Sequence, residues 1–244
     1  MSMVIEGFWQ QLIKCNFAIM EAVISHKQEL GTGIYTVADI SRLLDLPKKK
    51  VRKYLNDYWD ERLGMKLFNE TYTWSADNNI KAVNFYTLIE LFVCFRLQEL
   101  GVSPRQVLQS RETMAKELHV PYPFATSNLL TDGSRIWYEF KDAMVNADGS
   151  KQTGFVEFIK SFAEKLDFNA HRIAEKFWPA GKENAIVVDP HHQFGQPVIE
   201  GTNISAEVIY SMYESGEHVK TIGVLYDLSE KEVQDVIAFY NKAA

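Results

Sequence analysis

Residues 36–56 impose the strongest constraint on the fold, because two short helical patterns stand there with a break between them. Thr36 and Asp39 have the spacing of a capping box, in which each side chain bonds the other residue's backbone N–H at the start of a helix. Pro47 suits the first turn of a second helix, since the N–H that proline lacks has no partner there. The stretch therefore predicts two helices joined by a tight turn.

The second of these helices, expected over 47–56, is strongly basic on its outer faces. Val51, Tyr54 and Leu55 fall on one side at helical spacing. The outward positions are Lys48, Lys49, Lys50, Arg52, Lys53 and Asn56. Lysine and arginine attract phosphates, and arginine or asparagine can read base edges in the major groove. The pattern is typical of a DNA-binding helix-turn-helix, although the solvated face of an ordinary helix pair can carry the same residues.

Further elements are predicted directly after this pair. Met65–Phe68 and Thr71–Trp74 flank Asn69 and Glu70, which favours a small hairpin within 63–75 in the position of a wing, with a plain loop as the alternative. Lys66 lies in this predicted hairpin and joins the candidate DNA-binding residues. Two helices should follow, over 84–100 and 104–118, because Gly101 suits a helix end, and Ser103 and Pro104 suit a helix start.

The charge of the chain is unevenly distributed. The 244 residues carry a net charge of −6, but residues 183–244 hold ten acidic and three basic residues, which leaves +1 on residues 1–182. We call residues 183–244 the tail. The acidic total therefore does not exclude nucleic-acid binding by the front part of the chain.

Composition favours a cytoplasmic protein. The apolar run over 85–100 contains Glu90 and Arg96 and is too short to span a bilayer. The N-terminus carries Glu6 and lacks the basic leader of a secretory signal. Cys15 and Cys94 are isolated thiols without metal-ligand spacing, which indicates a reducing compartment and core packing.

The remaining segments predict smaller elements. Residues 3–30 form an expected helix whose broad apolar surface packs on its own domain or in a dimer contact. In the middle, Leu129–Leu130 and Arg135–Phe140 predict a hairpin, and the apolar residues from Phe155 to Leu166 a short helix. In the tail, Ile186–Val188 and Pro197–Ile199 predict paired strands. Three helices should follow, with these residues inward: Val208, Ile209, Met212, Val219, Ile222, Leu225, Val233, Val236, Ile237 and Tyr240.

No pattern of an enzyme was found. Asp189, His191 and His192 invite a metal or acid–base interpretation, but no further ligand stands at a workable spacing. The glycines near Gly195 and Gly201 do not follow a nucleotide-binding spacing, and no nucleophile has a recognisable signature. We therefore predict a protein that is not an enzyme and holds no metal or cofactor.

Two stretches resemble known families. The predicted helix-turn-helix and hairpin, followed by F-Y-T-L-I-E-L-F-V-C-F-R-L-Q-E-L-G-V-S-P-R-Q-V-L, resemble the DNA-binding domain of MerR-type regulators. Pro121 and Pro123 interrupt the position where those regulators continue into a long dimerising helix. The tail pattern D-P…F-G-Q-P-V-I-E-G-T resembles a small domain of unknown function (DUF433-like) of bacterial antitoxins, with Asn203 where many members place arginine.

The combined resemblance implies a VapB-like antitoxin of a type II toxin–antitoxin system. Such a protein would autoregulate its operon by binding operator DNA and would neutralise a PIN-like ribonuclease toxin. The expected fold is mainly α with small β-hairpins. Its divisions are an N-terminal helix over 1–34, a MerR-like winged helix-turn-helix domain over 35–120, a connecting hairpin and helix over 121–182, and an acidic trihelical domain over 183–244.

The sequence assigns the partner contact to a glycine- and proline-rich loop of the tail, because such a loop lets a neighbouring backbone approach closely. The residues of this predicted contact are Phe194, Gln196, Pro197, Gly201, Thr202 and Asn203. A homodimer is expected, since helix-turn-helix proteins usually bind paired half-sites. Two alternatives stay open: a MerR-like regulator that responds to a small-molecule effector, and a protein-interaction module whose basic helix never meets DNA.

Overall fold

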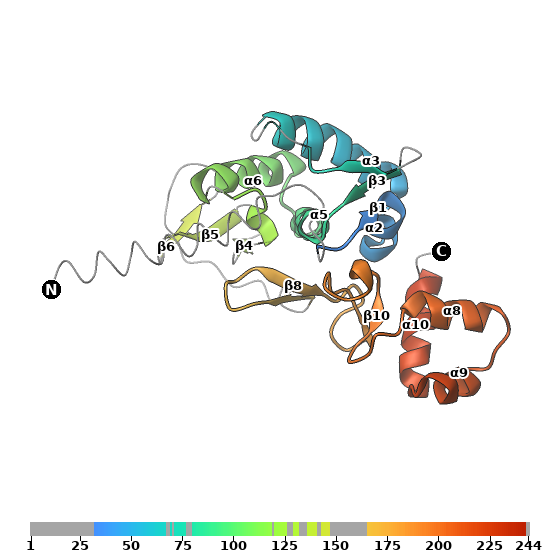
Figure 1. Cartoon of the computed structure of the whole chain (residues 1–244). Helices are drawn as coiled ribbons and strands as arrows, with labels where there is room; N and C mark the ends of the chain where they lie inside the picture. The colour runs from blue at the N-terminus through green and yellow to red at the C-terminus, as the bar shows by residue number, and fades with distance from the viewer. Residues whose placement is uncertain are drawn as a thin grey trace.

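A computed structural model describes residues 32–66, 69, 71–76, 80–118, 120–125, 129–131, 136–140, 143–146 and 165–242. This part of the chain is mainly helical and carries small antiparallel sheets (Figure 1). The helix predicted over 3–30 lies outside the described residues. None of the described helices combines the length and the apolar character needed to cross a membrane.

The predicted capping box and tight turn are confirmed. Helix α2 (Val37–Leu44) begins after Thr36, whose Oγ1 accepts a hydrogen bond from the Asp39 N–H at 3.3 Å, while Asp39 Oδ2 accepts one from the Thr36 N–H at 2.9 Å. The helix ends at Asp45, which adopts the left-handed conformation (φ 53°), and the Leu46 N–H then bonds the Ser41 carbonyl at 2.9 Å. These bonds satisfy backbone groups that a helix end leaves without partners.

The second helix is much longer than the sequence predicted. Pro47 is the residue before helix α3 (Lys48–Lys53) rather than within its first turn, and α3 runs without a break into a π-helical segment, η1 (Tyr54–Met65). Leu55, Trp59 and Leu63 follow one another at intervals of four residues and are fully buried. This continuous apolar stripe keeps the chain helical beyond Asn56, so the predicted helix end is wrong.

The predicted hairpin within 63–75 is also wrong, because Met65 still belongs to the helix. The strands form later in the chain, as β2 (Trp74–Ala76) and β3 (Ile80–Val83). β3 pairs antiparallel with β2 on one side and with β1 (Tyr35–Thr36) on the other, which gives the order β1-β3-β2.

Helices α5 (Phe85–Glu99) and α6 (Pro104–Leu118) confirm the two helices predicted after the hairpin. The Asn84 Oδ1 atom accepts the Thr87 N–H at 2.9 Å and so caps α5. Gly101, at φ 101°, makes the turn that follows α5. α5 is buried on most of its faces, including Cys94, whose thiol pKa is raised to about 12 by burial.

A buried ion pair joins α5 to α6. Arg111 Nε donates to Glu90, and both side chains are fully buried. Arg111 Nη2 also donates to the Pro121 carbonyl at 2.6 Å and to the Tyr72 hydroxyl at 3.1 Å. The second Glu90 oxygen accepts the Phe124 N–H at 2.7 Å, in the short 3-10 turn η2 (Pro123–Ala125). The pair thus fixes two helices and the segment that leaves α6.

The middle of the chain confirms the predicted hairpin. Strand β4 (Leu129–Thr131) pairs antiparallel with β5 (Ile136–Phe140), and β5 pairs with β6 (Ala143–Asn146). The helix predicted from Phe155 is wrong at its end, because Leu166 lies in strand β7 (Leu166–Phe168), paired with β8 (Ala174–Phe177). Residues 147–164 lie outside the described residues.

The predicted strands and helices of the tail are confirmed. Strand β9 (Ile186–Val187) pairs antiparallel with β10 (Val198–Ile199), and a short 3-10 turn, η3 (Gln193–Gly195), stands between them. Three helices follow, α8 (Ala206–Glu214), α9 (Val219–Tyr226) and α10 (Glu230–Lys242).

Two of the predicted inward residues of the tail are exposed. Ile209, Ile222, Val233 and Val236 are fully buried, as predicted, but Val208 and Leu225 are exposed. The apolar stripe that each helix buries is narrower than the sequence pattern suggested. Val208 and Leu225, at the edge of this pattern, therefore face solvent.

We predict that Arg111→Met lowers the free energy of unfolding by about 3–5 kcal/mol, because Glu90 is then buried without its charged partner. Burial already raises the pKa of Glu90, with Arg111 opposing the rise. A carboxyl group whose pKa is higher in the folded state gains stability as the pH falls, so the deficit should shrink in acid. Urea unfolding at several pH values measures both effects.

The exposed Arg96–Glu99 ion pair on α5 supplies the control. Arg96→Met should change the unfolding free energy by no more than about 1 kcal/mol. Glu90→Gln combined with Arg111→Met should be more stable than Arg111→Met alone, since the unpaired charge is gone. If Arg111→Met and Arg96→Met lowered the free energy of unfolding equally, the buried pair would contribute no more to stability than an exposed pair.

Candidate nucleic-acid interface and partner-binding loop

The basic face predicted from the sequence is exposed on α3. Lys48, Lys49, Lys50, Arg52 and Lys53 all face solvent, whereas Val51, Tyr54 and Leu55 lie in the core, as predicted. Within the described part of the chain, no ion pair involves any of the five bases. Their charge therefore remains available to an external anion.

Two predicted members of the DNA-binding set stand apart from this face. Asn56 is half-buried, and its Oδ1 atom accepts a hydrogen bond from Lys81 Nζ at 2.6 Å. Lys66 is exposed at the far end of η1, beyond Asp57, Asp60 and Glu61, and not on a hairpin. Of the predicted DNA-binding residues, the structure therefore brings together only the five bases of α3.

Core aromatic residues position these first turns. The Tyr54 hydroxyl donates to Gln98 Oε1 at 3.0 Å, and the Tyr54 ring lies 4.6 Å from that of Phe95 on α5. Lys50 Nζ also lies 4.6 Å from the Phe95 ring centre, so a cation–π contact holds this lysine toward α5.

The acidic tail docks on α2 and leaves the face of α3 uncovered. The Arg42 guanidinium lies 5.1 Å from the centre of the Tyr240 ring on α10, and Lys242 pairs with Asp45 at 3.8 Å. Figure 1 shows α2 between α3 and the tail helices. The tail therefore does not compete for the bases of α3.

The predicted partner loop is already engaged in part by its own chain. The Ile34 N–H donates to the Phe194 carbonyl at 3.0 Å, and Gln196 Nε2 donates to the Ile34 carbonyl at 3.3 Å. Pro197 is buried, whereas the Phe194 side chain is 71% exposed. Of these three predicted contact residues, Phe194 is therefore the one that offers a free side chain.

A close approach of Tyr35 explains the glycine in this loop. Tyr35 is fully buried, its hydroxyl has no hydrogen-bond partner among the described residues, and its ring lies against Gly33 and Gly195. Burial raises the Tyr35 pKa well above its ordinary value, and the charges of Asp189 and Asp39 raise it further. Sequence reasoning missed this contact, because it joins residues 160 positions apart.

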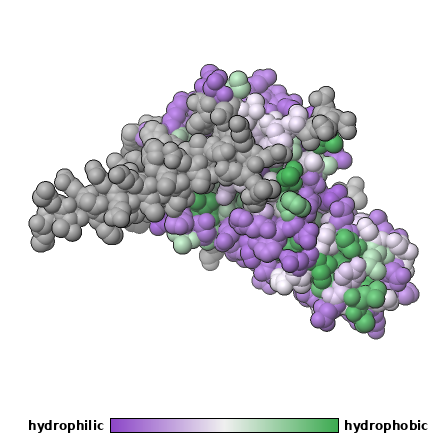
Figure 2. Space-filling model, viewed as in Figure 1, coloured by the Kyte–Doolittle hydropathy of each residue, from purple (hydrophilic) through white to green (hydrophobic). Residues whose placement is uncertain are grey.

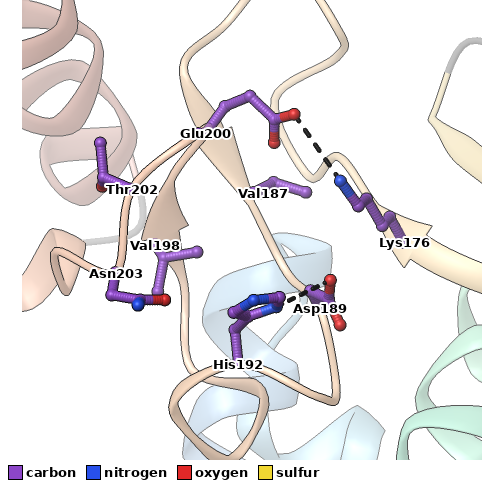
Figure 3. Close-up of a pocket in the computed structure, with 9 residues that line it drawn as sticks. Lys176, Val187, Asp189, His192, Val198, Glu200, Thr202 and Asn203 are labelled. Atoms are coloured by element: carbon purple, nitrogen blue, oxygen red, sulfur yellow. Dashed lines mark ion pairs between the residues drawn. The ribbon is translucent and has the colours of Figure 1, made fainter.

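The other predicted contact residues, Gly201, Thr202 and Asn203, line a polar pocket of about 330 Å³ (Figure 3). Lys176 pairs there with Glu200 at 3.7 Å, and His192 Nδ1 lies 3.0 Å from Asp189 Oδ2. Both carboxylates of the pocket therefore already have a partner within it.

The Asp189 carboxylate builds the turn that carries the two histidines. Asp189 Oδ1 accepts the His191 N–H at 2.9 Å, and the His192 N–H bonds the Asp189 carbonyl at 3.1 Å. Among the described residues, no three histidine, cysteine, aspartate or glutamate side chains are placed to hold a metal ion. The geometry thus gives Asp189 a role in turn formation.

We predict that Gly195→Ala destabilises the protein more than Gly201→Ala. Both glycines have a positive φ, 81° and 74°, so alanine costs about 1–2 kcal/mol at either position. At Gly195 the new Cβ would also lie 2.7 Å from Tyr35 Cζ and closer still to its hydroxyl, whereas nothing lies within 4 Å at Gly201. Chemical denaturation of both variants isolates the steric contribution.

Tyr35→Phe should restore part of the stability of Gly195→Ala, because it removes the nearest clashing atom. Equal losses for Gly195→Ala and Gly201→Ala would contradict the close packing of Tyr35 against the loop.

Comparisons with known proteins find similarity along most of this chain. Residues 186–240 match the family described as "Protein of unknown function (DUF433)". The chain is 19% identical over 223 residues to the Mycobacterium tuberculosis protein named "Putative antitoxin VapB45", a match that covers 84% of this chain and 92% of the relative. It also shares its fold, with a TM-score of 0.61 and 16% identity, with the crystal structure of Rv2018 from Mycobacterium tuberculosis, over 83% of this chain and 96% of that one. The chain is therefore similar to an antitoxin-like protein along most of its length.

Proposed function

We propose that this protein is a DNA-binding antitoxin, which binds operator DNA through the basic face of α3 and a PIN-like ribonuclease toxin through its tail. The observation that carries the DNA-binding half is the exposed cluster of five bases on α3 without an ion pair among the described residues. The similarity to an antitoxin over 84% of the chain supports the other half.

The order of elements supports a winged helix-turn-helix. The helices α2 and α3 stand between β1 and the β2–β3 pair, and the sheet order β1-β3-β2 brings that pair back beside the first strand. A hairpin after the second helix is the position of a wing, and α5 and α6 follow it as in the predicted MerR-like domain. The strands of the hairpin begin at Trp74 and Ile80, where Met65 and Thr71 were expected, but the order of elements is the one expected.

The position of the bases along the helix suits DNA. In helix-turn-helix proteins, the N-terminal residues of the second helix contact base edges while the first helix crosses the backbone. Here the bases occupy α3, and the acids Asp57, Asp60 and Glu61 begin only in η1. A helix that enters the groove with its N-terminal end therefore presents positive charge and keeps its acids at a distance. A homodimer on paired half-sites belongs to the same proposal.

The tail supports a protein partner. Its ten acidic and three basic residues would repel the phosphates of a nucleic acid. The exposed Phe194 side chain in its first loop offers an aromatic anchor, a residue type that is frequent at interfaces. Both features favour a basic protein surface over DNA as the ligand of the tail.

The DNA-binding half predicts that Lys49→Ala combined with Lys53→Ala weakens operator binding and lowers the slope of log K against log salt by about one unit for each lost phosphate contact. Stability should stay within about 0.5 kcal/mol, because both side chains are exposed. Titration of the upstream region by fluorescence anisotropy at several salt concentrations measures both quantities.

A matched control removes the same charge elsewhere, with Lys116→Ala and Lys220→Ala, at exposed sites on α6 and α9. This control should bind DNA like the unaltered protein. An equal loss in both double variants would mean that total charge, and not the face of α3, governs binding.

The toxin-binding half predicts that Phe194→Ala weakens capture of the ribonuclease-like product of the neighbouring gene about tenfold, as expected for an aromatic anchor. Phe168→Ala, at another exposed phenylalanine, is the control. Binding of both variants to the purified product is measured by calorimetry. Unchanged affinity of Phe194→Ala would exclude the loop from the contact.

A further inference from the structure

The chain contains two helix pairs with the same turn. Asp45 follows α2 and Asp227 follows α9, and both adopt the left-handed conformation, at φ 53° and 55°. Each is followed by a leucine whose N–H bonds the carbonyl five residues earlier, at 2.9 Å for Leu46 and 2.8 Å for Leu228. Both first helices have eight residues. We call α2 with α3 the front pair and α9 with α10 the tail pair.

Equivalent positions of the two pairs differ in charge. The front pair begins its second helix with Lys48, Lys49 and Lys50, whereas the tail pair has Glu230, Lys231 and Glu232 at the same distances from the turn. Two buried positions agree, since Ile40 matches Ile222, Val51 matches Val233, and all four are fully buried. The tail pair therefore keeps the frame of the front pair but lacks its attraction for phosphate.

The two pairs also differ in what covers them. Leu43 of the front pair is buried at 5% exposure, whereas Leu225, at the equivalent position of the tail pair, is 61% exposed. Its neighbour Val224 is 84% exposed, and Val208 and Tyr213 on α8 are also exposed. We call these four residues of α8 and α9 the apolar face. Figure 2 shows hydrophobic side chains gathered on this end of the molecule.

Acidic residues stand next to the residues of the apolar face in the sequence. Glu207 precedes Val208, Glu214 follows Tyr213, Glu217 stands in the turn between α8 and α9, and Asp227 follows the end of α9; all four are exposed. Lys220 is the basic residue on α9 itself. An apolar surface with such a margin complements a segment that has apolar residues on one side and lysine or arginine beside them.

Charge argues against the two occupants that this chain could supply. A second copy of the apolar face would bring the same acids together. The apolar segment 3–30 of the sequence carries three acidic and two basic residues, so it offers no net positive charge to match them. A basic partner remains.

We propose that the apolar face of α8 and α9 binds a basic amphipathic segment of a partner protein. This inference rests on the proposed function, in which that partner is the toxin. Helix α9 of the tail pair then joins α8 in a protein-docking surface, whereas the front pair uses its second helix for DNA.

The test uses the full-length protein and two labelled helical peptides of equal length, one of leucine and lysine and one of leucine and glutamate. We expect the leucine–lysine peptide to bind, with an affinity that falls as salt is added, and the leucine–glutamate peptide to bind at least about tenfold more weakly. Val224→Ser with Leu225→Ser should weaken binding of the leucine–lysine peptide at least about tenfold. The control is Met65→Ser with Ile80→Ser, at residues 48% and 50% exposed, which should bind the peptide normally.

Equal peptide binding by the unaltered protein and by the Val224→Ser/Leu225→Ser variant would overturn the proposal, as would equal binding of both peptides. A smaller mass of this variant in light scattering would also overturn it, since the face would then join copies of this chain. Thermal unfolding establishes that the variant is folded.

Binding of the product of the neighbouring gene distinguishes failure of this inference from failure of the proposed function. If that product binds the unaltered protein and the variant equally, the face is not the docking surface, while the proposed function stands. If it binds neither, while the leucine–lysine peptide still requires Val224 and Leu225, the proposed function fails and the basic specificity of the face stands. Loss of the product in the variant alone supports both.

Discussion

The buried pair of Glu90 and Arg111 is the interaction on which the front part of the structure depends. Two charges removed from water cost several kcal/mol each unless their remaining hydrogen-bonding groups find partners. Here the pair recruits the Phe124 N–H, the Pro121 carbonyl and the Tyr72 hydroxyl, which leaves Arg111 Nη1 without a hydrogen-bond partner among the described residues. Because these partners come from separate segments, the pair is stable only when α5, α6 and the chain around them are correctly assembled.

This core sets the position of the candidate DNA-binding helix. α5 carries the pair through Glu90, and one to two turns later presents Phe95 and Gln98 to Tyr54 at the junction of α3 and η1. On another side of α5, the Phe92 ring lies 4.9 Å from that of Phe177 in β8. The same helix thus supports the basic face and the sheet that leads into the tail, which explains why α5 is apolar on nearly all sides.

The sequence predicted the elements that local chemistry determines. The capping box of Thr36, the helix start at Ser103 and Pro104, and the paired strands around Phe194 all follow from residues close together in the chain. The exposed bases of α3 were predictable for the same reason, because Val51, Tyr54 and Leu55 define the buried side.

Contacts between distant residues decided the rest. The helix continues through η1 because Trp59 and Leu63 are buried. Their spacing indicated this burial, but the polar residues between them hid the pattern. Periodicity could not show that Leu225 stays exposed while the matching Leu43 is buried, because the difference lies in what covers each helix. The packing of Tyr35 on Gly195 likewise has no signal in either segment alone.

The two helix pairs share one frame but expose different side chains. The turn requires an aspartate in the left-handed conformation, a following leucine and a few buried aliphatic residues, and both pairs meet these requirements. The turn places no requirement on the exposed positions. These positions can therefore carry lysines in the front pair, and glutamates and exposed apolar residues in the tail pair. A shared fold with a solved structure at 16% identity therefore establishes the frame. The class of ligand has to be argued from the exposed side chains of each pair, which is why the basic face of α3 and the apolar face of α8 and α9 are assigned different partners.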